Sequence, residues 1–153
     1  LPSITAQESS IVFPTFTSDT AWSLGVSLRE RLLTLTSKPV AISISLASSA
    51  PLPQVLFYTV TRPGTTPDND SWVSRKRQTV LRFGCSTWFM HCKFQGNEVA
   101  FAAKYGLGEA AGQYAIHGGG VPIRVTGVEG VVGVIIVSGL AQEDDHQVVI
   151  ETV

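Results

Sequence analysis

The segment Val40-Ala-Ile-Ser-Ile-Ser-Leu46 alternates large apolar residues with Ala41, Ser43 and Ser45. A period of two puts the large residues on one face of a β-strand, so this segment predicts a strand with one buried face. Pro51 and Pro53 indicate a turn, and residues 54–60 are rich in β-branched and aromatic side chains. Together the two segments predict a β-hairpin.

A helix is predicted before this hairpin. Ser18 is a favoured N-cap residue, and Asp19 suits the positive end of the helix dipole. Apolar residues then recur at spacings of three and four: Ala21, Leu24, Leu28, Leu32 and Leu35. Lys38-Pro39 ends this pattern, because the residue before a proline avoids helical backbone angles. Residues 1–17 lack periodicity and predict an extended arm.

A second helical region follows a polar loop at residues 62–70, whose Asp68 or Asp70 is a candidate N-cap. Four of the eleven cationic residues lie within 71–82, and an apolar stripe continues to Cys92. We expect one helix with a kink at Gly84. Because its second half is apolar nearly all round, the sheet or a neighbouring subunit must bury it.

The C-terminal half contains a second predicted hairpin. Residues 97–105 have no clear period, and residues 106–120, with six of the fourteen glycines, predict an irregular connection. Residues 121–126 and 131–138 read as strands joined by a turn with glycine at both corners. Residues 143–149 predict a short helix with acidic residues in its first turn.

Composition limits the classes of partner. The 153 residues carry a formal charge of -1, so no global field attracts nucleic acid or anionic membranes, and neither is expected as a partner. Only 15% of residues are charged, which favours buried contacts between subunits and a homo-oligomer. Cys85 and Cys92 lie about 10 Å apart along the predicted helix, too far for a disulfide. Free thiols and the lack of an export signal or membrane span predict a cytoplasmic location.

Sequence motifs do not predict a catalytic activity. Residues 106–112 superficially resemble a dinucleotide fingerprint, but no convincing strand precedes them and no long helix follows. Nucleophile-elbow, P-loop, H-E-x-x-H and C-x-x-C motifs are absent. The three histidines are too scattered to predict a metal cluster.

Two histidines are nevertheless candidate functional residues. His146 follows Asp145, and a carboxylate beside an imidazole suits general acid–base catalysis; the alternative is a solvated acidic helix start with an ordinary surface histidine. His117 precedes three glycines, Gly118, Gly119 and Gly120, whose bare backbone would let a planar ligand approach. The alternative there is a simple turn.

The most concentrated polar group is Asp68-Asn69-Asp70 with Trp72 and Arg75-Lys76. It would suit a clamp for an anion such as a carboxylate, with Arg75 as a bidentate donor. An equally good interpretation is a helix cap combined with a salt bridge between subunits.

These motifs, taken in order, resemble the haem-degrading domain family, in its uncharacterised cytosolic HbpS- and GlcG-like branch. The resemblance covers about residues 10–150. It rests on Asp68-Asn69 with Trp72 and Arg75-Lys76, then Gly119-Gly-Val-Pro-Ile123, then Val137-Ser-Gly-Leu140 with Asp145-His146.

The resemblance implies an α/β (α+β) fold: a profilin-like three-layer α/β/α domain at residues 18–153, preceded by the arm at 1–17. Its antiparallel sheet would have about five strands, with helices on both faces. It also implies dimers that assemble into a larger ring, and haem as the cofactor to consider.

The sequence thus predicts an oligomeric protein that binds haem or another small carboxylate ligand at a subunit interface. The site would comprise Asp68, Asn69, Trp72, Arg75, Lys76, His117, Gly118, Gly119, Gly120 and His146. An alternative is a non-enzymatic adaptor ring that displays its C-terminal tail, Ile150-Glu-Thr-Val153, to a protein partner. A third hypothesis is a small-molecule enzyme that uses Asp145 and His146.

Overall fold

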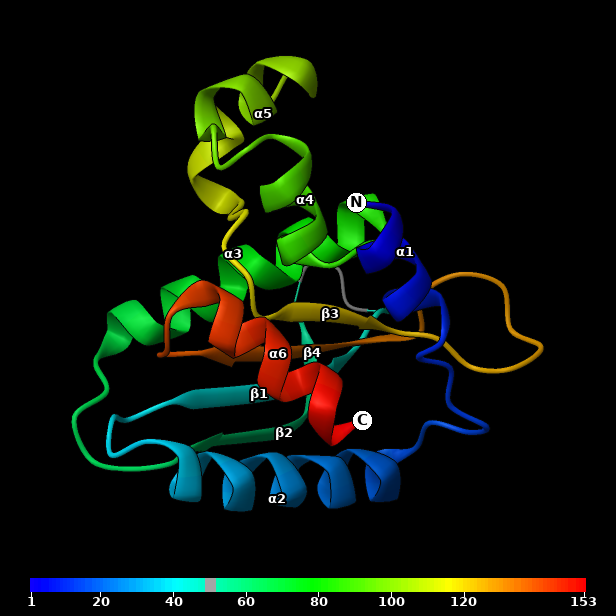
Figure 1. Ribbon diagram of the computed structural model, residues 1–153, viewed down its shortest axis with the longest axis vertical. Helices are drawn as coiled ribbons and strands as arrows, with labels where there is room; N and C mark the ends of the chain where they lie inside the picture. Colours follow the sequence, from blue (N-terminus) through cyan, green and yellow to red (C-terminus); the bar gives the residue numbers. More distant parts are fainter. Residues whose placement is uncertain (49–51) are drawn as a thin grey trace.

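The computed structural model describes residues 1–48 and 52–153, which form a four-stranded antiparallel sheet with helices around it (Figure 1). The strand order is β2-β1-β4-β3, with β1 and β4 in the centre. The strands are β1 (Ala41–Leu46), β2 (Gln54–Val60), β3 (Gly120–Ile123) and β4 (Gly133–Ser138). Both predicted hairpins are confirmed, since β1 pairs with β2 and β3 pairs with β4. The turn predicted at Pro51 lies outside the described residues.

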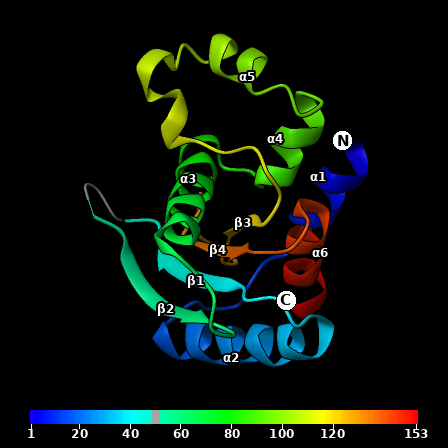
Figure 2. The same cartoon turned by 90° about the vertical axis from the view of Figure 1, so that its left-hand side faces the viewer.

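Helices cover both faces of the sheet (Figures 1 and 2). They are α1 (Pro2–Ser9), α2 (Ser18–Leu35), α3 (Pro67–Phe83), α4 (Thr87–Lys93), α5 (Glu98–Lys104) and α6 (Gln142–Thr152), with a 3-10 turn η1 (Gly108–Gln113). α2 and α6 pack on one face and α3 on the other, which confirms the three-layer α/β/α prediction. About five strands were expected; beyond the four described, the segment after α1 adds a single bridge from Phe13 to Val125.

The face toward α2 and α6 is apolar. Ile42 and Ile44 of β1 pack there with Leu28 of α2 and Val148 of α6 in one buried cluster. The leucine spacing of α2 and the period of two in β1 therefore produce the layer that they predict.

The opposite face departs from the prediction, because Ser43 and Ser45 of β1 are also fully buried. α3 covers this face, and the guanidinium of Arg77 donates a hydrogen bond to Ser43 Oγ at 3.1 Å. The strand is buried on both sides because small residues leave room for the long polar side chains of α3.

The helix termini differ from the predictions in ways that local chemistry explains. Thr17, not Ser18, is the N-cap of α2, and Thr66 is the N-cap of α3, with Pro67 in the first turn where its missing N–H costs nothing. Gly84 takes a left-handed conformation (φ 66°) that ends α3, so α3 and α4 are two helices rather than one kinked helix.

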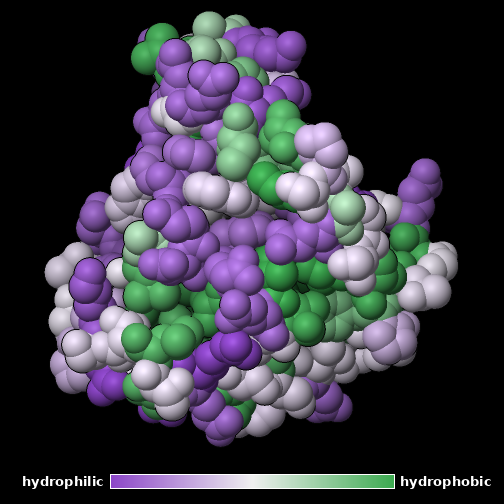
Figure 3. Space-filling view, viewed as in Figure 1, coloured by the Kyte–Doolittle hydropathy of each residue, from purple (hydrophilic) through white to green (hydrophobic). Residues whose placement is uncertain are grey.

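Two segments for which no helix was predicted contain helices. Pro2–Ser9, in the predicted extended arm, forms α1, whose Glu8 accepts a hydrogen bond from the backbone N–H of Ser86 at 3.1 Å. Residues 97–105 contain α5, capped by Asn97. α5 and η1 protrude from the body of the domain, and the larger apolar patches in Figure 3 lie lower, at the level of the sheet. No helix of the described residues is long and apolar enough to span a bilayer.

Candidate functional site

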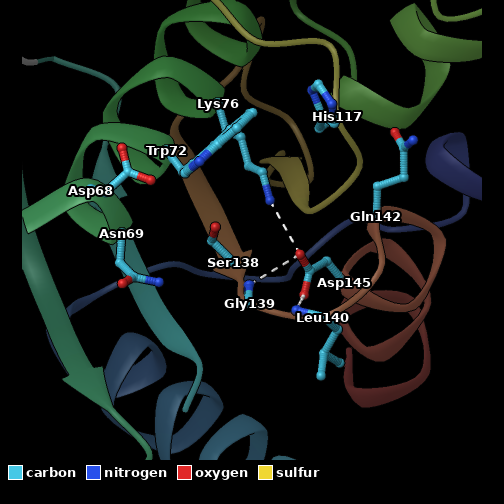
Figure 4. Close-up of a pocket in the computed structure, with 10 residues that line it drawn as sticks. All are labelled: Asp68, Asn69, Trp72, Lys76, His117, Ser138, Gly139, Leu140, Gln142 and Asp145. Carbon is cyan, nitrogen blue, oxygen red and sulfur yellow. Dashed lines mark hydrogen bonds and ion pairs between the residues drawn. The ribbon is translucent and has the colours of Figure 1, made fainter. Parts of the chain in front are cut away.

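A pocket of about 270 Å³ lies where β4 ends, between the N-terminal half of α3 and the start of α6 (Figure 4). It brings together residues from distant parts of the sequence, and we call it the site pocket. Its lining residues are Asp68, Asn69, Trp72, Lys76, His117, Ser138, Gly139, Leu140, Gln142 and Asp145.

Helical spacing explains the contribution of α3. Asp68, Trp72 and Lys76 follow one another at intervals of four, so they share one face of the helix. Asn69 has a second role, because its side-chain oxygen accepts a hydrogen bond from Thr66 N at 2.9 Å and completes the capping box. A helix cap is therefore present, but Thr66 and Asn69 form it, and not Asp68 or Asp70.

A buried ion pair forms the floor of the site pocket. Lys76 Nζ lies 3.3 Å from Asp145 Oδ2 and donates a hydrogen bond to the carbonyl of Val137 at 3.0 Å. Asp145 also accepts hydrogen bonds from the backbone N–H groups of Gly139, at 3.3 Å, and Leu140, at 2.9 Å (Figure 4). Both charged side chains are only 3% exposed. The pair ties α3 to the start of α6 across the end of the sheet.

Burial dominates the protonation of this pair. Desolvation raises the pKa of Asp145 to about 6, even though Lys76 and the backbone donors favour the carboxylate. Desolvation likewise lowers the pKa of Lys76, against the attraction of Asp145. The pair therefore places a proton exchangeable near neutral pH at the floor of a pocket, an arrangement common at functional sites.

The glycines after His117 serve the close packing around this pair. A β-carbon at Gly119, whose φ is 127°, would lie 2.2 Å from the Val137 carbonyl oxygen and 2.7 Å from Lys76 Nζ. A β-carbon at Gly118 would lie 2.3 Å from the carbonyl oxygen of Gln142. The close approach expected at these glycines is thus made by the protein's own backbone and by Lys76.

His117 and Trp72 form one wall of the site pocket. Their rings meet edge to face with centroids 4.8 Å apart. His117 Nδ1 lies 3.4 Å from Glu98 Oε1 but has no hydrogen-bond partner. Burial lowers the pKa of His117 from 6.5, so its imidazole is neutral at pH 7. A neutral imidazole is the form that binds metal ions.

Arg75 does not line the site pocket. Successive residues of a helix point about 100° apart, so Arg75 and Lys76 face different sides of α3. The Arg75 guanidinium stacks on Trp72, 4.5 Å from the ring centroid, and its Nε donates to the Tyr114 carbonyl at 3.4 Å. It borders a separate cavity of about 340 Å³ beside α5. The structure therefore does not bring Arg75 and Lys76 together as one anion clamp.

His146 also points away from the site pocket. Its Nε2 lies 3.2 Å from Gln7 Oε1 of α1, and its ring lies near Trp88. Burial lowers the pKa of His146 to about 4. Asp145 and His146 are both buried and bond to different partners, so the solvated helix start considered as their alternative is wrong. No contact between the Asp145 and His146 side chains supports the acid–base pair that was predicted for them.

The C-terminal tail is not a free extended segment. α6 continues to Thr152, and Glu151 forms an ion pair with Arg31 of α2 at 2.9 Å. Capture of residues 150–153 as an extended peptide would require the last turn of α6 to unwind. The tail as a docking segment stays a prediction.

Four lining residues were missed from the sequence: Ser138, Gly139, Leu140 and Gln142. They form the connection between β4 and α6, where a strand gives way to a helix. Polar residues and glycine at such a junction are the signal that could have identified them, since connections at strand ends commonly carry binding residues.

Comparisons with known proteins agree with this architecture. The sequence model of the family described as "Haem degrading protein HbpS-like" matches residues 16–153. A UPF0303 protein of Streptomyces avermitilis is 41% identical over 151 residues, which cover 99% of this chain and 86% of the relative. The crystal structure of the Ybr137w protein has a TM-score of 0.88 and 35% sequence identity, covering 99% of this chain and 83% of that one.

A more distant structure shares the fold. The crystal structure of the PduOC:haem complex has a TM-score of 0.68 at 21% identity, covering 93% of this chain and 96% of that one. At this identity the likeness concerns the fold alone. The family match over residues 16–153 and the 41% identical relative support assignment to a family, and not only to a fold. This chain belongs to the HbpS-like family of haem-degrading proteins.

Proposed function

We propose that this chain binds a small carboxylate ligand in the site pocket, with haem as the first candidate, and that it does so as a homo-oligomer. The observation that carries the proposal is Lys76. Its ammonium has three donors, of which Val137 and Asp145 take two. The third remains for an anion, and a buried charge-assisted hydrogen bond is strong.

The wall of the site pocket fits a haem edge. His117 is neutral, so it can offer a ring nitrogen to iron, and Trp72 beside it offers an apolar face for a macrocycle. The unpartnered Nδ1 of His117 would donate its proton toward Glu98, leaving Nε2 for the metal. When bound, haem would supply an iron centre for redox chemistry, and these residues would hold and orient it.

Size places a limit on this arrangement. The site pocket, at about 270 Å³, is slightly smaller than typical ligand pockets, which run from about 300 to 1,000 Å³. Only one edge of a haem would enter it, with one propionate near Lys76. The remainder of the macrocycle would need a second subunit to cover it, which agrees with the predicted site at a subunit interface.

A haemin titration followed in the Soret region tests the proposal. We expect a saturable shift at one haem per chain or per pair of chains. His117→Ala should weaken binding at least about tenfold, whereas His91→Ala should not. His91 is the matched control because it stacks on Trp88 and does not line the site pocket.

Iron-free protoporphyrin IX distinguishes the proposed contact of Lys76 with a propionate from the proposed contact of His117 with iron. It carries the same carboxylates, so it should still bind, more weakly than haemin, if Lys76 holds a propionate. The absence of a saturable shift with haemin would remove haem as the ligand. Equal loss of binding in the two histidine variants would remove His117 from the site.

A further inference from the structure

The edge strand β2 carries several exposed apolar side chains. β2 ends the sheet, and no described strand pairs with its outer side. Val55, Tyr58 and Val60 are 42%, 44% and 37% exposed, and Trp22 of α2, which packs against Phe57 of the same strand, is 65% exposed. Soluble proteins usually protect an edge strand with charged residues or proline, and Gln54–Val60 has neither.

The backbone of β2 presents free hydrogen-bonding groups along this edge. Thr61 N donates to the Val40 carbonyl at 2.9 Å, so alternation along an antiparallel pair turns the amides of Phe57 and Thr59 toward β1. The amides of Tyr58 and Val60 then face outward. The irregularity in the β1–β2 pairing lies before Phe57, so Phe57–Val60 is a regular stretch.

A groove continues the apolar surface from β2 to α2. It has a volume of about 540 Å³, and Trp22 packs edge-on against Phe57 within it, with ring centroids 5.8 Å apart. The same groove is bordered by one cation, Arg29, and one anion, Glu30. A partner with charges of only one sign would be attracted to one of these residues and repelled by the other.

A second copy of this chain satisfies all of these features. Under a two-fold axis, the same strand arrives in the antiparallel direction, and the Arg29–Glu30 pair arrives in reversed order, so each charge can face its opposite. We propose that two copies pair through the outer edges of β2, forming one continuous eight-stranded sheet, with Trp22 buried between the subunits. The proposal names the contact face of the dimer and does not depend on the identity of the ligand.

Two substitutions test this face by different means. Val60→Pro removes an outward N–H without breaking a β1–β2 hydrogen bond, and proline is tolerated at such positions of an edge strand. Trp22→Glu places a charge in the groove. In sedimentation velocity, the wild-type mass should be an even multiple of 16.4 kDa, and both variants should have half that mass or less.

Val99→Glu is the matched control, because Val99 is 80% exposed on α5, at the opposite end of the molecule from α2 (Figure 1). It should keep the wild-type mass. Circular dichroism and a cooperative thermal transition establish that each variant folds, and a misfolded variant is replaced by Val55→Lys. A wild-type monomer at micromolar concentrations, or unchanged mass in folded edge variants, would overturn the proposal.

Hydrogen exchange tests the backbone pairing directly. In the dimer, the Tyr58 and Val60 amides should exchange at least about tenfold more slowly than in the Trp22→Glu variant. Fast exchange at both amides in the wild-type oligomer would place the interface elsewhere on the molecule.

Discussion

Both faces of the sheet are buried, but the layer toward α3 adds buried charged side chains to its apolar cluster of Val73, Val80, Val134 and Ile136. Toward α2 and α6, the cluster around Leu28 and Ile42 contains apolar side chains throughout. Toward α3, the layer includes Lys76, Arg77 and Thr79, all buried. The site pocket lies at the end of this polar layer.

This difference indicates that the two layers have different roles. Replacing a buried ion pair with apolar residues is often neutral or stabilising, so burying Lys76 and Asp145 is a poor way to gain stability. We therefore interpret the polar layer under α3 as the functional side of the domain.

The largest expected effect comes from breaking the buried ion pair. Lys76→Ala leaves the Asp145 carboxylate buried without its cationic partner and should lower the free energy of unfolding by about 3–5 kcal/mol in chemical denaturation. The matched control is Arg75→Ala, which removes a cation from the preceding position of the same helix without leaving a buried charge. A loss below about 1 kcal/mol for Lys76→Ala would show that the pair is not buried in solution.

On the apolar face, Leu28→Ala should lower the free energy of unfolding by about 2–5 kcal/mol, because Leu28 is fully buried and a cavity would remain. Haemin affinity should stay within about twofold of wild type when measured below the unfolding transition. A large change in affinity would contradict the division between the two faces.

The pH dependence of stability distinguishes the contributions of the adjacent buried residues Asp145 and His146. Unfolded His146 takes up a proton near pH 6.5, whereas folded His146 does so near 4, so its contribution to stability is lost as the pH falls through this window. Folded Asp145 is protonated near pH 6 and the unfolded residue near 3.8, so its contribution rises over nearly the same window. The two effects oppose each other.

Of these two opposing effects, His146→Gln should leave only that of Asp145. The free energy of unfolding should then rise between pH 6.5 and 4, by up to about 3 kcal/mol relative to the wild-type curve. Asp145→Asn should show the reverse, with stability falling over the same range. Parallel curves for wild type and His146→Gln would mean that His146 is not buried as a neutral ring.

The smallest expected effect lies at the start of α2. Thr17→Ala removes the N-cap side chain and should cost about 1 kcal/mol of unfolding free energy. Ser18→Ala, at the first helical position, is the matched control and should cost less than about half as much. Equal losses of unfolding free energy in the two variants would contradict the assignment of Thr17 as the N-cap.

Much of the fold could be predicted because its signals are local. The leucine spacing of α2 and the alternation in β1 determine which side chains can share a face. α1 could not be predicted, because none of its residues is buried. Its contacts, Glu8 with Ser86 and Gln7 with His146, join positions far apart in the sequence.

The candidate site could be predicted only in part for a related reason. Asp68, Trp72 and Lys76 share a helix face, so their spacing was informative. The sequence could not show that Arg75 and His146 point away from the site pocket, since adjacent residues in a helix diverge and tertiary packing decides which one faces it. Asp145 was proposed as part of a catalytic pair, whereas the structure joins it to Lys76.

The double variant Lys76→Met/Asp145→Leu tests most directly whether the polar layer serves ligand binding rather than stability. Its free energy of unfolding and its haemin affinity would be measured on the same preparation. The expected result is stability within about 1 kcal/mol of wild type or higher, with haemin affinity lowered at least about tenfold. Wild-type affinity, or a loss of stability as large as that of Lys76→Ala, would contradict the interpretation.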